Sequence, residues 1–278
     1  KEAYAAGNSA VHELKDMVKE CHRAGIEVVL EMPFTEGVPA QTALECLKFY
    51  MLEYHVDGFV VNPYCVPWEM LCEDPLLKDI KLMRKDDAFQ NIMRRFLKGD
   101  ENMVNDVIWA LPHHSASDGK CNYITTQTGF TLWDLVSYDC KHNEANGENN
   151  TDGPDYNYSW NCGAEGPSRK RAVTTLRKNQ VRNAFALLLL AQGTPCILAG
   201  DEFYNSQKGN NNVYCQDNEI GWVEWNKLKT DDTLFNYVRE LIAFRKKHPC
   251  LHRAEELKGL DRTACGVPDV SYHGENAW

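Results

Sequence analysis

One stretch of the chain, residues 56–63, ends in a residue type that could belong to an active site. Its apolar run begins after Asp57 and Gly58 and stops at Asn62 and Pro63, which predicts a short buried strand. In a parallel α/β barrel, the residue at the carboxyl end of such a strand points into the active-site face. That residue is Asn62, whose amide can hydrogen-bond a hydroxyl group but is a poor nucleophile.

Two polar loops supply a second set of candidates. Residues 141–161 and 200–213 are rich in Asn, Gly, Asp and Glu, and long ordered loops of this kind are usually functional. Aromatic residues lie in or beside both loops, where they could contact a ligand or serve only in packing. The candidate ligand-binding residues are Trp160, Asn210, Asn211, Asn212, Tyr214, Asp217 and Trp222.

Helical and strand patterns alternate along the chain and would position these candidates. Asn8 or Ser9 is expected to cap the first helix, which ends at Gly25, and Asp86 is expected to cap a later one, which ends at Gly99. The other expected elements are strands over 26–32, 56–62 and 196–199 and helices around 44–51, over 168–191 and around 234–244. This alternation predicts an α/β fold with a parallel sheet and crossover helices.

Composition excludes several classes of function. The 278 residues carry a net charge of -10, which argues against nucleic-acid or anionic-membrane partners because those need clustered positive charge. The basic residues between 169 and 182 are expected to form a solvated helix face. No run of 18 apolar residues occurs, so no membrane span is expected.

The cysteines and histidines do not form a metal-binding pattern. Eleven cysteines include no Cys-x-x-Cys pair, so we expect reduced thiols, mostly packed as small hydrophobic side chains. His113 and His114 have no third ligand within reach in the sequence and are interpreted as a loop pair. We therefore expect no metal and no cofactor.

Four longer motifs carry a resemblance to a known family. They occupy residues 141–150, 158–163, 199–203 and 209–218, and the last is followed by Trp222 and Trp225. Over these motifs the chain resembles isoamylase-type debranching enzymes of the α-amylase superfamily, glycoside hydrolase family 13. The resemblance implies a (β/α)8 TIM barrel, which this chain would enter just before the third strand. Residues 1–250 would then form a partial barrel domain, and residues 251–278 the start of a truncated C-terminal β-rich domain.

The resemblance also identifies positions that hold catalytic acids in the family. Retaining glycosidases need a carboxylate nucleophile and a carboxyl acid/base about 5–5.5 Å apart, and the superfamily adds a third acid that stabilises the transition state. In this chain the nucleophile position is Asn62, the acid/base position is Lys85 and the third position is Thr128. The family Asn-His pair that ends the third strand is also missing from residues 30–36. Because an amide, an amine and a hydroxyl replace three acids, we expect no catalytic residue.

Relocated acids are the alternative to this loss of catalysis. The other candidates are Asp57, Asp86, Asp87 and the adjacent Asp201 and Glu202. Asp57 precedes its strand and so lies at the wrong end of a barrel, and Asp86 is expected to cap a helix. Adjacent residues in an extended segment point in opposite directions, which argues against Asp201 and Glu202 as a pair.

Taken together, the resemblance implies a non-catalytic subunit of the kind found among plant isoamylases. Such a subunit would pair with a catalytically active isoamylase, bind branched α-glucan such as amylopectin, and reside in a plastid. Two alternatives stay open, an active α-1,6-glucosidase with relocated acids and a purely structural partner that does not touch glucan. Release of reducing ends from amylopectin by the chain without any partner would favour the active glucosidase. Failure to bind amylopectin would favour the structural partner.

Overall fold

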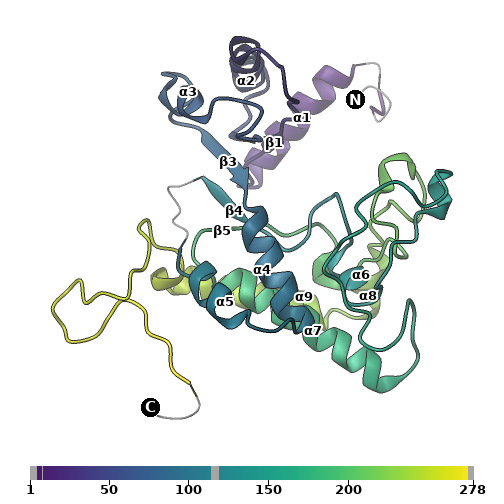
Figure 1. Cartoon of the computed structure of the whole chain (residues 1–278). Helices are drawn as coiled ribbons and strands as arrows, with labels where there is room; N and C mark the ends of the chain where they lie inside the picture. The colour runs from purple at the N-terminus through teal and green to yellow at the C-terminus, as the bar shows by residue number, and fades with distance from the viewer. Residues whose placement is uncertain (1–4, 8, 114–118, 275–278) are drawn as a thin grey trace. The chain divides into compact units, whose positions relative to one another are not determined.

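The computed structural model describes residues 5–7, 9–113 and 119–274, which divide into two compact units, Lys1–Lys85 and Asp86–Trp278. Each unit combines short parallel strands with helices (Figure 1). Strand β1 pairs with β2, β2 with β3 and β4 with β5, each pair parallel, as an α/β barrel wall requires. This division after Lys85 does not test the expected domain boundary at residue 250, which stays a prediction.

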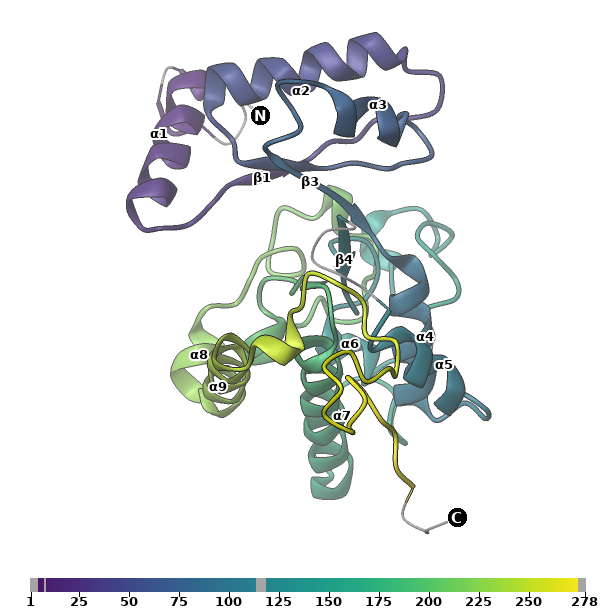
Figure 2. The ribbon, with the colours of Figure 1, turned by 90° about the vertical axis from the view of Figure 1, so that its left-hand side faces the viewer.

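The first unit alternates helices and strands in the order expected for crossover connections. Its elements are α1 (Ala10–Arg23), β1 (Val29–Glu31), α2 (Ala40–Tyr54), β2 (Gly58–Val60), α3 (Trp68–Glu73) and β3 (Lys81–Lys85). Helices α2 and α3 lie above β1 and β3 in the view of Figure 2, and α1 runs beside them. Between helices and strands lies an apolar core that includes Phe59, Val61 and Leu47, each almost fully buried.

Gly58 sets how closely β2 approaches β3. Val29 pairs with Gly58 in β1–β2, and Gly58 pairs with Lys81 in β2–β3. A Cβ atom at position 58 would lie 2.3 Å from the Lys81 carbonyl oxygen. Any larger residue would therefore push the two strands apart, so the Asp57–Gly58 breaker at the start of the strand is also a packing requirement.

The second unit holds more helix and most of the polar loops. Its elements are α4 (Asp87–Lys98), α5 (Val104–Ala110), β4 (Lys120–Asn122), α6 (Leu132–Leu135), η2 (Glu144–Asn146), α7 (Arg171–Leu190), β5 (Thr194–Pro195), η3 (Asp201–Phe203), η4 (Val213–Cys215), α8 (Asn226–Thr230), α9 (Thr233–Lys247) and η5 (Pro249–Leu251). Helix α7 packs against both α4 and α9, around a core that includes Phe130, Val181, Phe185 and Leu234.

The expected helix caps are confirmed where the structure describes them. Ser9 caps α1 by accepting a hydrogen bond from the His12 backbone N–H; the alternative cap, Asn8, lies outside the described residues. Asp86 caps α4 by accepting bonds from the backbone N–H groups of Ala88 and Phe89, and Gly99 ends the helix in the left-handed conformation.

Two element predictions and the prediction about the cysteines need correction. Strand β1 starts only at Val29, where pairing with β2 begins, and Ile26 is 57% exposed rather than buried. The strand expected over 196–199 is instead β5 at Thr194–Pro195, which pairs with Cys121 and Asn122 of β4. The Cys196 N–H makes the last backbone bond to β4, to the Asn122 carbonyl at 2.7 Å, and Cys196 is exposed rather than buried. Only Cys121 and Cys162 are buried among the eleven free thiols, so most cysteines do not pack as hydrophobic side chains.

The segment after α9 has little regular structure. Residues 252–274 form turns and coil, with no strand among these described positions. Asp269 and Arg262 organise it, since the Asp269 carboxylate accepts bonds from the Lys258 and Gly259 backbone and from the Arg262 guanidinium. The expected beginning of a β-rich domain in this region stays a prediction.

Candidate functional site

Two of the three positions singled out in the sequence, Asn62 and Lys85, lie in the first unit, and neither has a carboxyl group. Asn62 is exposed, and its side-chain oxygen accepts a hydrogen bond from the Tyr64 backbone N–H at 3.0 Å. The amide therefore stabilises the turn that follows β2. Lys85 closes β3, and its ammonium lies 2.6 Å from the Glu31 carboxylate at the end of β1. Both side chains have local structural partners.

Thr128, the third position, belongs to the second unit. It is exposed, and the Thr126 hydroxyl donates to its carbonyl oxygen at 3.0 Å. Its neighbour Gly129 donates its N–H to the Asn211 carbonyl at 2.9 Å. Thr128 thus lies on a turn that is held by the loop carrying Asn211.

The alternative acids in the first half of the chain have structural roles. Asp57 accepts bonds from the Val28 backbone N–H at 2.7 Å and from the His22 ring at 2.8 Å. Burial tends to raise the pKa of Asp57, but these bonds outweigh it and the pKa is lowered. Asp86 caps α4, and the exposed Asp87 accepts a bond from the Tyr123 hydroxyl. Each carboxylate is accounted for by a local contact.

Asp201 is the most perturbed acid, and its surroundings explain why. Only 2% of it is exposed, and burial raises the pKa of its carboxyl group to about 7. A pKa near neutrality is typical of general acids. However, one oxygen accepts from the Thr125 hydroxyl and the other accepts from the Leu132 N–H at 2.8 Å. Asp201 therefore ties together the segment that carries Thr128, and Glu202 binds the Gly200 N–H separately.

Asp134, two residues after Leu132, is a second buried acid whose carboxylate is held by hydrogen bonds. It is fully buried, and burial raises its pKa. Its oxygens accept from the Ser206 hydroxyl at 2.6 Å and from the Gln207 N–H at 2.7 Å. Both buried acids thus anchor the loop after β5 to the segment after β4, and sequence reasoning missed Asp134 because α6 resembles an ordinary short helix.

Two asparagines join the polar loops to each other. Asn143 donates from its amide to the Asn211 side-chain oxygen at 2.9 Å, and the Asn211 N–H returns a bond of 2.9 Å to the Asn143 oxygen. The Asn211 amide also donates to the Pro154 carbonyl and to the Asn157 side chain. Gly153 has φ +71° and must be small, because a Cβ there would lie 2.4 Å from the Asn211 oxygen.

Asp152 is a second junction between the same loops. Its carboxylate accepts from the amides of Asn146 at 2.7 Å and Asn212 at 2.9 Å, and the bond from Asn146 is the largest cause of its lowered pKa. Asn210 donates to the Asn146 side chain at 2.8 Å. We call this set, Asn143, Asn146, Asp152, Asn157, Asn210, Asn211 and Asn212, the asparagine lattice.

The lattice changes how the predicted binding residues are understood. Asn210 and Asn211 are each 1% exposed, and their amides are used inside the protein. They therefore shape the loops rather than offer free polar groups to a ligand. By contrast, Tyr214 is 66% and Trp222 59% exposed. Asp217 accepts a bond from the Trp222 indole N–H at 2.9 Å and so helps to orient that ring.

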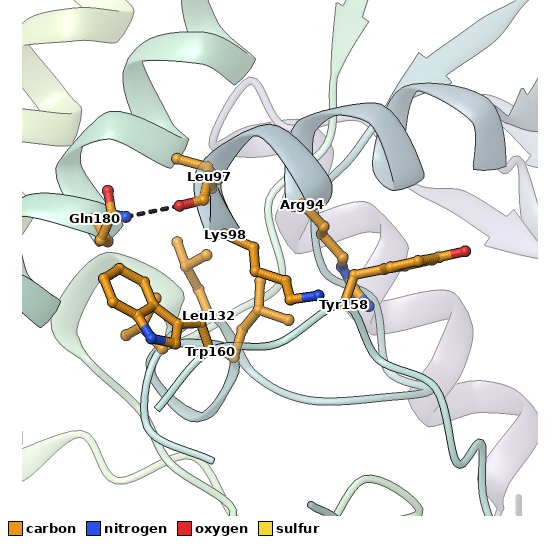
Figure 3. Close-up of a pocket in the computed structure, with 9 residues that line it drawn as sticks. Arg94, Leu97, Lys98, Leu132, Tyr158, Trp160 and Gln180 are labelled. Carbon is orange, nitrogen blue, oxygen red and sulfur yellow. Dashed lines mark hydrogen bonds between the residues drawn. The ribbon is translucent and has the colours of Figure 1, made fainter. Parts of the chain in front are cut away.

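Trp160 lies apart from the other predicted residues, in the wall of a narrow pocket that Figure 3 shows beside the end of α4. Arg94 enters the same pocket from α4 and is 5% exposed. Its guanidinium donates to the carbonyls of Ile124 at 2.7 Å and Asn157 at 3.1 Å. Burial lowers the pKa of Arg94 to about 10. Trp160 thus lines a pocket, whereas the rings of Tyr214 and Trp222 are exposed to solvent.

The basic run on α7 is only partly solvated. Arg177 is 1% exposed and donates to the carbonyls of Gly166 at 2.7 Å and Asn161 at 2.9 Å. The expectation of a solvated face is wrong for this residue, because its guanidinium satisfies carbonyl groups of the loop that precedes α7. Helical spacing alone gave no sign of those distant acceptors.

Two further findings concern the described residues as a whole. Within them, no three His, Cys, Asp or Glu side chains gather in a way that could hold a metal ion. No described helix combines the length and the apolar character needed to cross a membrane.

Comparison with known proteins identifies relatives in both sequence and structure. The glycogen debranching enzyme of Serratia proteamaculans (strain 568) is 32% identical, covering 87% of this chain and 49% of that protein. Isoamylase 1, chloroplastic, of Oryza sativa subsp. japonica is 28% identical, covering 90% and 44%. The crystal structure of pullulanase type I from Bacillus subtilis superposes with a TM-score of 0.65 at 18% identity, covering 90% of this chain and 45% of that one. No protein-family model matches the chain.

These comparisons define the fold first. The chain has the α/β-barrel fold of the pullulanases, in incomplete form, which confirms the fold class expected from the sequence. Its sequence is similar to those of proteins named glycogen debranching enzyme and isoamylase. It spans about half the length of the curated relatives it matches.

The relatives also carry internal segments that this chain lacks. The alignment with the rice protein extends over 356 positions, whereas the whole chain has 278 residues. Gaps within the matched region account for the excess.

Proposed function

We propose that this chain is a non-catalytic, isoamylase-type homologue that binds branched α-glucan. One contrast carries the proposal. The polar loops that resemble the family are held together by internal hydrogen bonds, while Asn62, Lys85 and Thr128 stand where the family has acids. A glycosidase that lacks its nucleophile, its acid/base and its third acid retains little rate.

The exposed aromatic residues are the proposed glucan contacts. Tyr214 and Trp222 present large ring surfaces to solvent, and the Asp217 carboxylate adds a hydrogen-bond acceptor beside one of them. Asn210, Asn211 and Asn212 contribute indirectly, because the asparagine lattice fixes the loops on which those rings sit. Trp160 is less suited to contact glucan, because the pocket that it lines holds only about 10 Å³, roughly the space of one water molecule. This division of roles refines the set of seven residues expected from the sequence.

The proposed partner is a catalytically active isoamylase in a hetero-oligomer. By resemblance, the chain corresponds to plant isoamylase 2, the subunit without activity of its own, and would support removal of α-1,6 branches from pre-amylopectin. Avidity from a second glucan-binding subunit can strengthen association without new chemistry. The proposed plastid location follows from this pairing, and the relatives include both chloroplastic isoamylases and bacterial debranching enzymes.

An assay of the purified chain with amylopectin tests the proposal. We expect the chain to sediment with amylopectin and to release no reducing ends in the absence of any partner. Release of reducing ends would favour the alternative, an α-1,6-glucosidase with relocated acids. Failure to sediment would favour a purely structural partner. A pull-down with full-length isoamylase then tests the hetero-oligomer directly.

A further inference from the structure

Tyr214, one of the proposed glucan contacts, is bonded to the other polar loop through its side chain. Its hydroxyl donates a hydrogen bond to the Glu148 carboxylate, which lies far away in the sequence. This bond is the largest cause of the rise in the pKa of Tyr214 to about 12. The hydroxyl is therefore engaged within the protein. Because the residue is 66% exposed, the part of the side chain that stays open to a ligand is its ring.

The backbone that carries Tyr214 is attached to the same loop. Two residues further on, the Gln216 amide donates to the Ala145 carbonyl at 2.9 Å. Two residues before it, the Asn212 amide donates to the Asp152 carboxylate at 2.9 Å. Contacts on both sides therefore hold η4 against the other polar loop.

The backbone of Glu148 is held as well. Its carbonyl oxygen accepts from the Thr151 hydroxyl at 2.6 Å and from the Thr151 N–H at 3.1 Å. Asn150 fixes the same turn, because its side chain donates to the Lys141 carbonyl at 3.1 Å and accepts from the Asn143 N–H at 2.8 Å. A hydrogen bond between groups that the fold already positions loses less conformational entropy when it forms. The bond to the tyrosine hydroxyl can therefore restrict the ring although both side chains are exposed.

Trp222, the second proposed contact, is supported from within its own turn. Its indole N–H donates to the Asp217 carboxylate at 2.9 Å, and its backbone N–H donates to the Asn218 carbonyl at 2.9 Å. The polar atom of each exposed ring is thus bonded to a carboxylate. This arrangement leaves the apolar ring faces for contact with a pyranose. The difference is that the support for Tyr214 comes from a distant loop.

We infer that Glu148 is a positioning residue for glucan binding, which sets the orientation of the Tyr214 ring through the bond between their side chains. A ring that is already oriented loses less entropy when a sugar stacks on it, and so binds more tightly. Glu148 acts through the ring and needs no contact with the glucan. This inference rests on the proposed glucan-binding function. It adds a residue that sequence reasoning missed, because nothing in the sequence shows that positions 148 and 214 meet.

A double-mutant cycle tests the bond. Maltoheptaose binding to the full chain would be measured by titration calorimetry, and unfolding by urea titration. Glu148→Ala and Tyr214→Phe each remove the bond and keep the aromatic ring, so each should weaken binding about threefold at an unchanged urea midpoint. The double variant should bind no worse than either single variant, because the bond is lost only once. Glu148→Gln keeps an acceptor oxygen for the hydroxyl and should restore most of the affinity.

Glu144→Ala is the matched control, because it removes the same charge from the same loop. Its carboxylate is 65% exposed and lies 4.0 Å from the His142 ring, and the variant should bind like the unmodified chain. An equal loss in this variant would overturn the positioning role.

The remaining outcomes separate the positioning role from the proposed function. Unchanged affinity in Glu148→Ala, losses that multiply in the double variant, or no recovery in Glu148→Gln would each overturn the role of Glu148. If Tyr214→Ala binds normally and Trp222→Ala does not, the positioning role fails while the proposed function stands. If the unmodified chain binds neither maltoheptaose nor amylopectin, both fail.

Discussion

Two sets of polar residues in this molecule differ in how they are held. In the asparagine lattice, Asn143 and Asn211 are buried and hydrogen-bond each other although they lie far apart in the sequence. Of the three positions assigned to family acids, Asn62 and Thr128 are exposed, and their hydrogen bonds reach only two residues away. The first set therefore stabilises the fold, whereas the second set is free to vary without unfolding it. The proposed loss of catalytic acids requires such a difference, because residues at the exposed positions can then change while the fold stays intact.

The largest expected effect tests the buried acid that supports the Thr128 segment. Asp201 has a pKa of about 7 in the folded chain against an ordinary value near 3.8. The folded state therefore holds its proton between these values while the unfolded state releases it, so the unfolding free energy falls as pH rises from about 4 to about 7. Asp201→Asn should remove this slope, which amounts to about 4 kcal/mol. Urea titrations across that range measure it.

Asp231 is the matched control because its shift has the opposite sign. The Lys178 ammonium lowers the pKa of Asp231 to about 2. Its contribution to stability is therefore present above pH 4 and is lost as pH falls toward 2. Asp231→Asn should leave the slope between pH 4 and 7 intact. An unchanged slope in Asp201→Asn would show that the carboxyl is ionised in the folded protein.

The next effect measures the lattice directly. Asn211→Ala removes the acceptor for Asn143 and the donor to Pro154 and Asn157. Because these groups are buried, leaving them unpaired should cost about 3 kcal/mol of unfolding free energy. Asn62→Ala, which removes one exposed turn contact, should cost less than about 1 kcal/mol. Equal losses in the two variants would contradict the contrast between lattice and strand ends.

Local features of this fold follow from the sequence, and long-range ones do not. Ser9, Asp86 and Gly99 bound their helices as expected, since a cap needs only residues within one helical turn. The ends of β1 and β5 were misplaced because strand limits depend on where a partner strand begins and stops. Apolar runs extend beyond those limits, and hydropathy alone does not mark them.

The candidate site shows the same limit. The sequence marks Asn210, Asn211 and Trp222 alike, as polar or aromatic residues in one loop. Only the fold shows that two of them are buried by contacts from residues 143–157 and that the third is exposed. Arg177 was misassigned for the same reason, because its carbonyl acceptors lie on the loop preceding its helix. Burial of polar groups depends on partners that periodicity does not reveal.

A smaller effect tests the exposed aromatic residues against the lattice. Trp222→Ala should weaken amylopectin binding about tenfold while leaving stability within about 0.5 kcal/mol, because its ring is largely in solvent. Sedimentation with amylopectin and urea titration provide the two measurements.

Trp109→Ala is the control for the loss of an exposed indole. Trp109 is 49% exposed on α5 and stacks on His113, outside the polar loops. Its variant should bind amylopectin like the unmodified chain. Equal weakening in both variants would mean that the binding is non-specific.

The smallest expected effect is none at all. Asn62→Asp restores a carboxylate at the nucleophile position, yet Lys85 still supplies an ammonium and Thr128 a hydroxyl. An ammonium paired with Glu31 at 2.6 Å is a poor proton donor at neutral pH, so leaving-group protonation stays unassisted. Reducing ends released from amylopectin should therefore equal those of the unmodified chain. Activity in this single variant would show that an acid outside the three positions completes the pair, and the contrast between a preserved scaffold and a lost reaction centre would no longer hold.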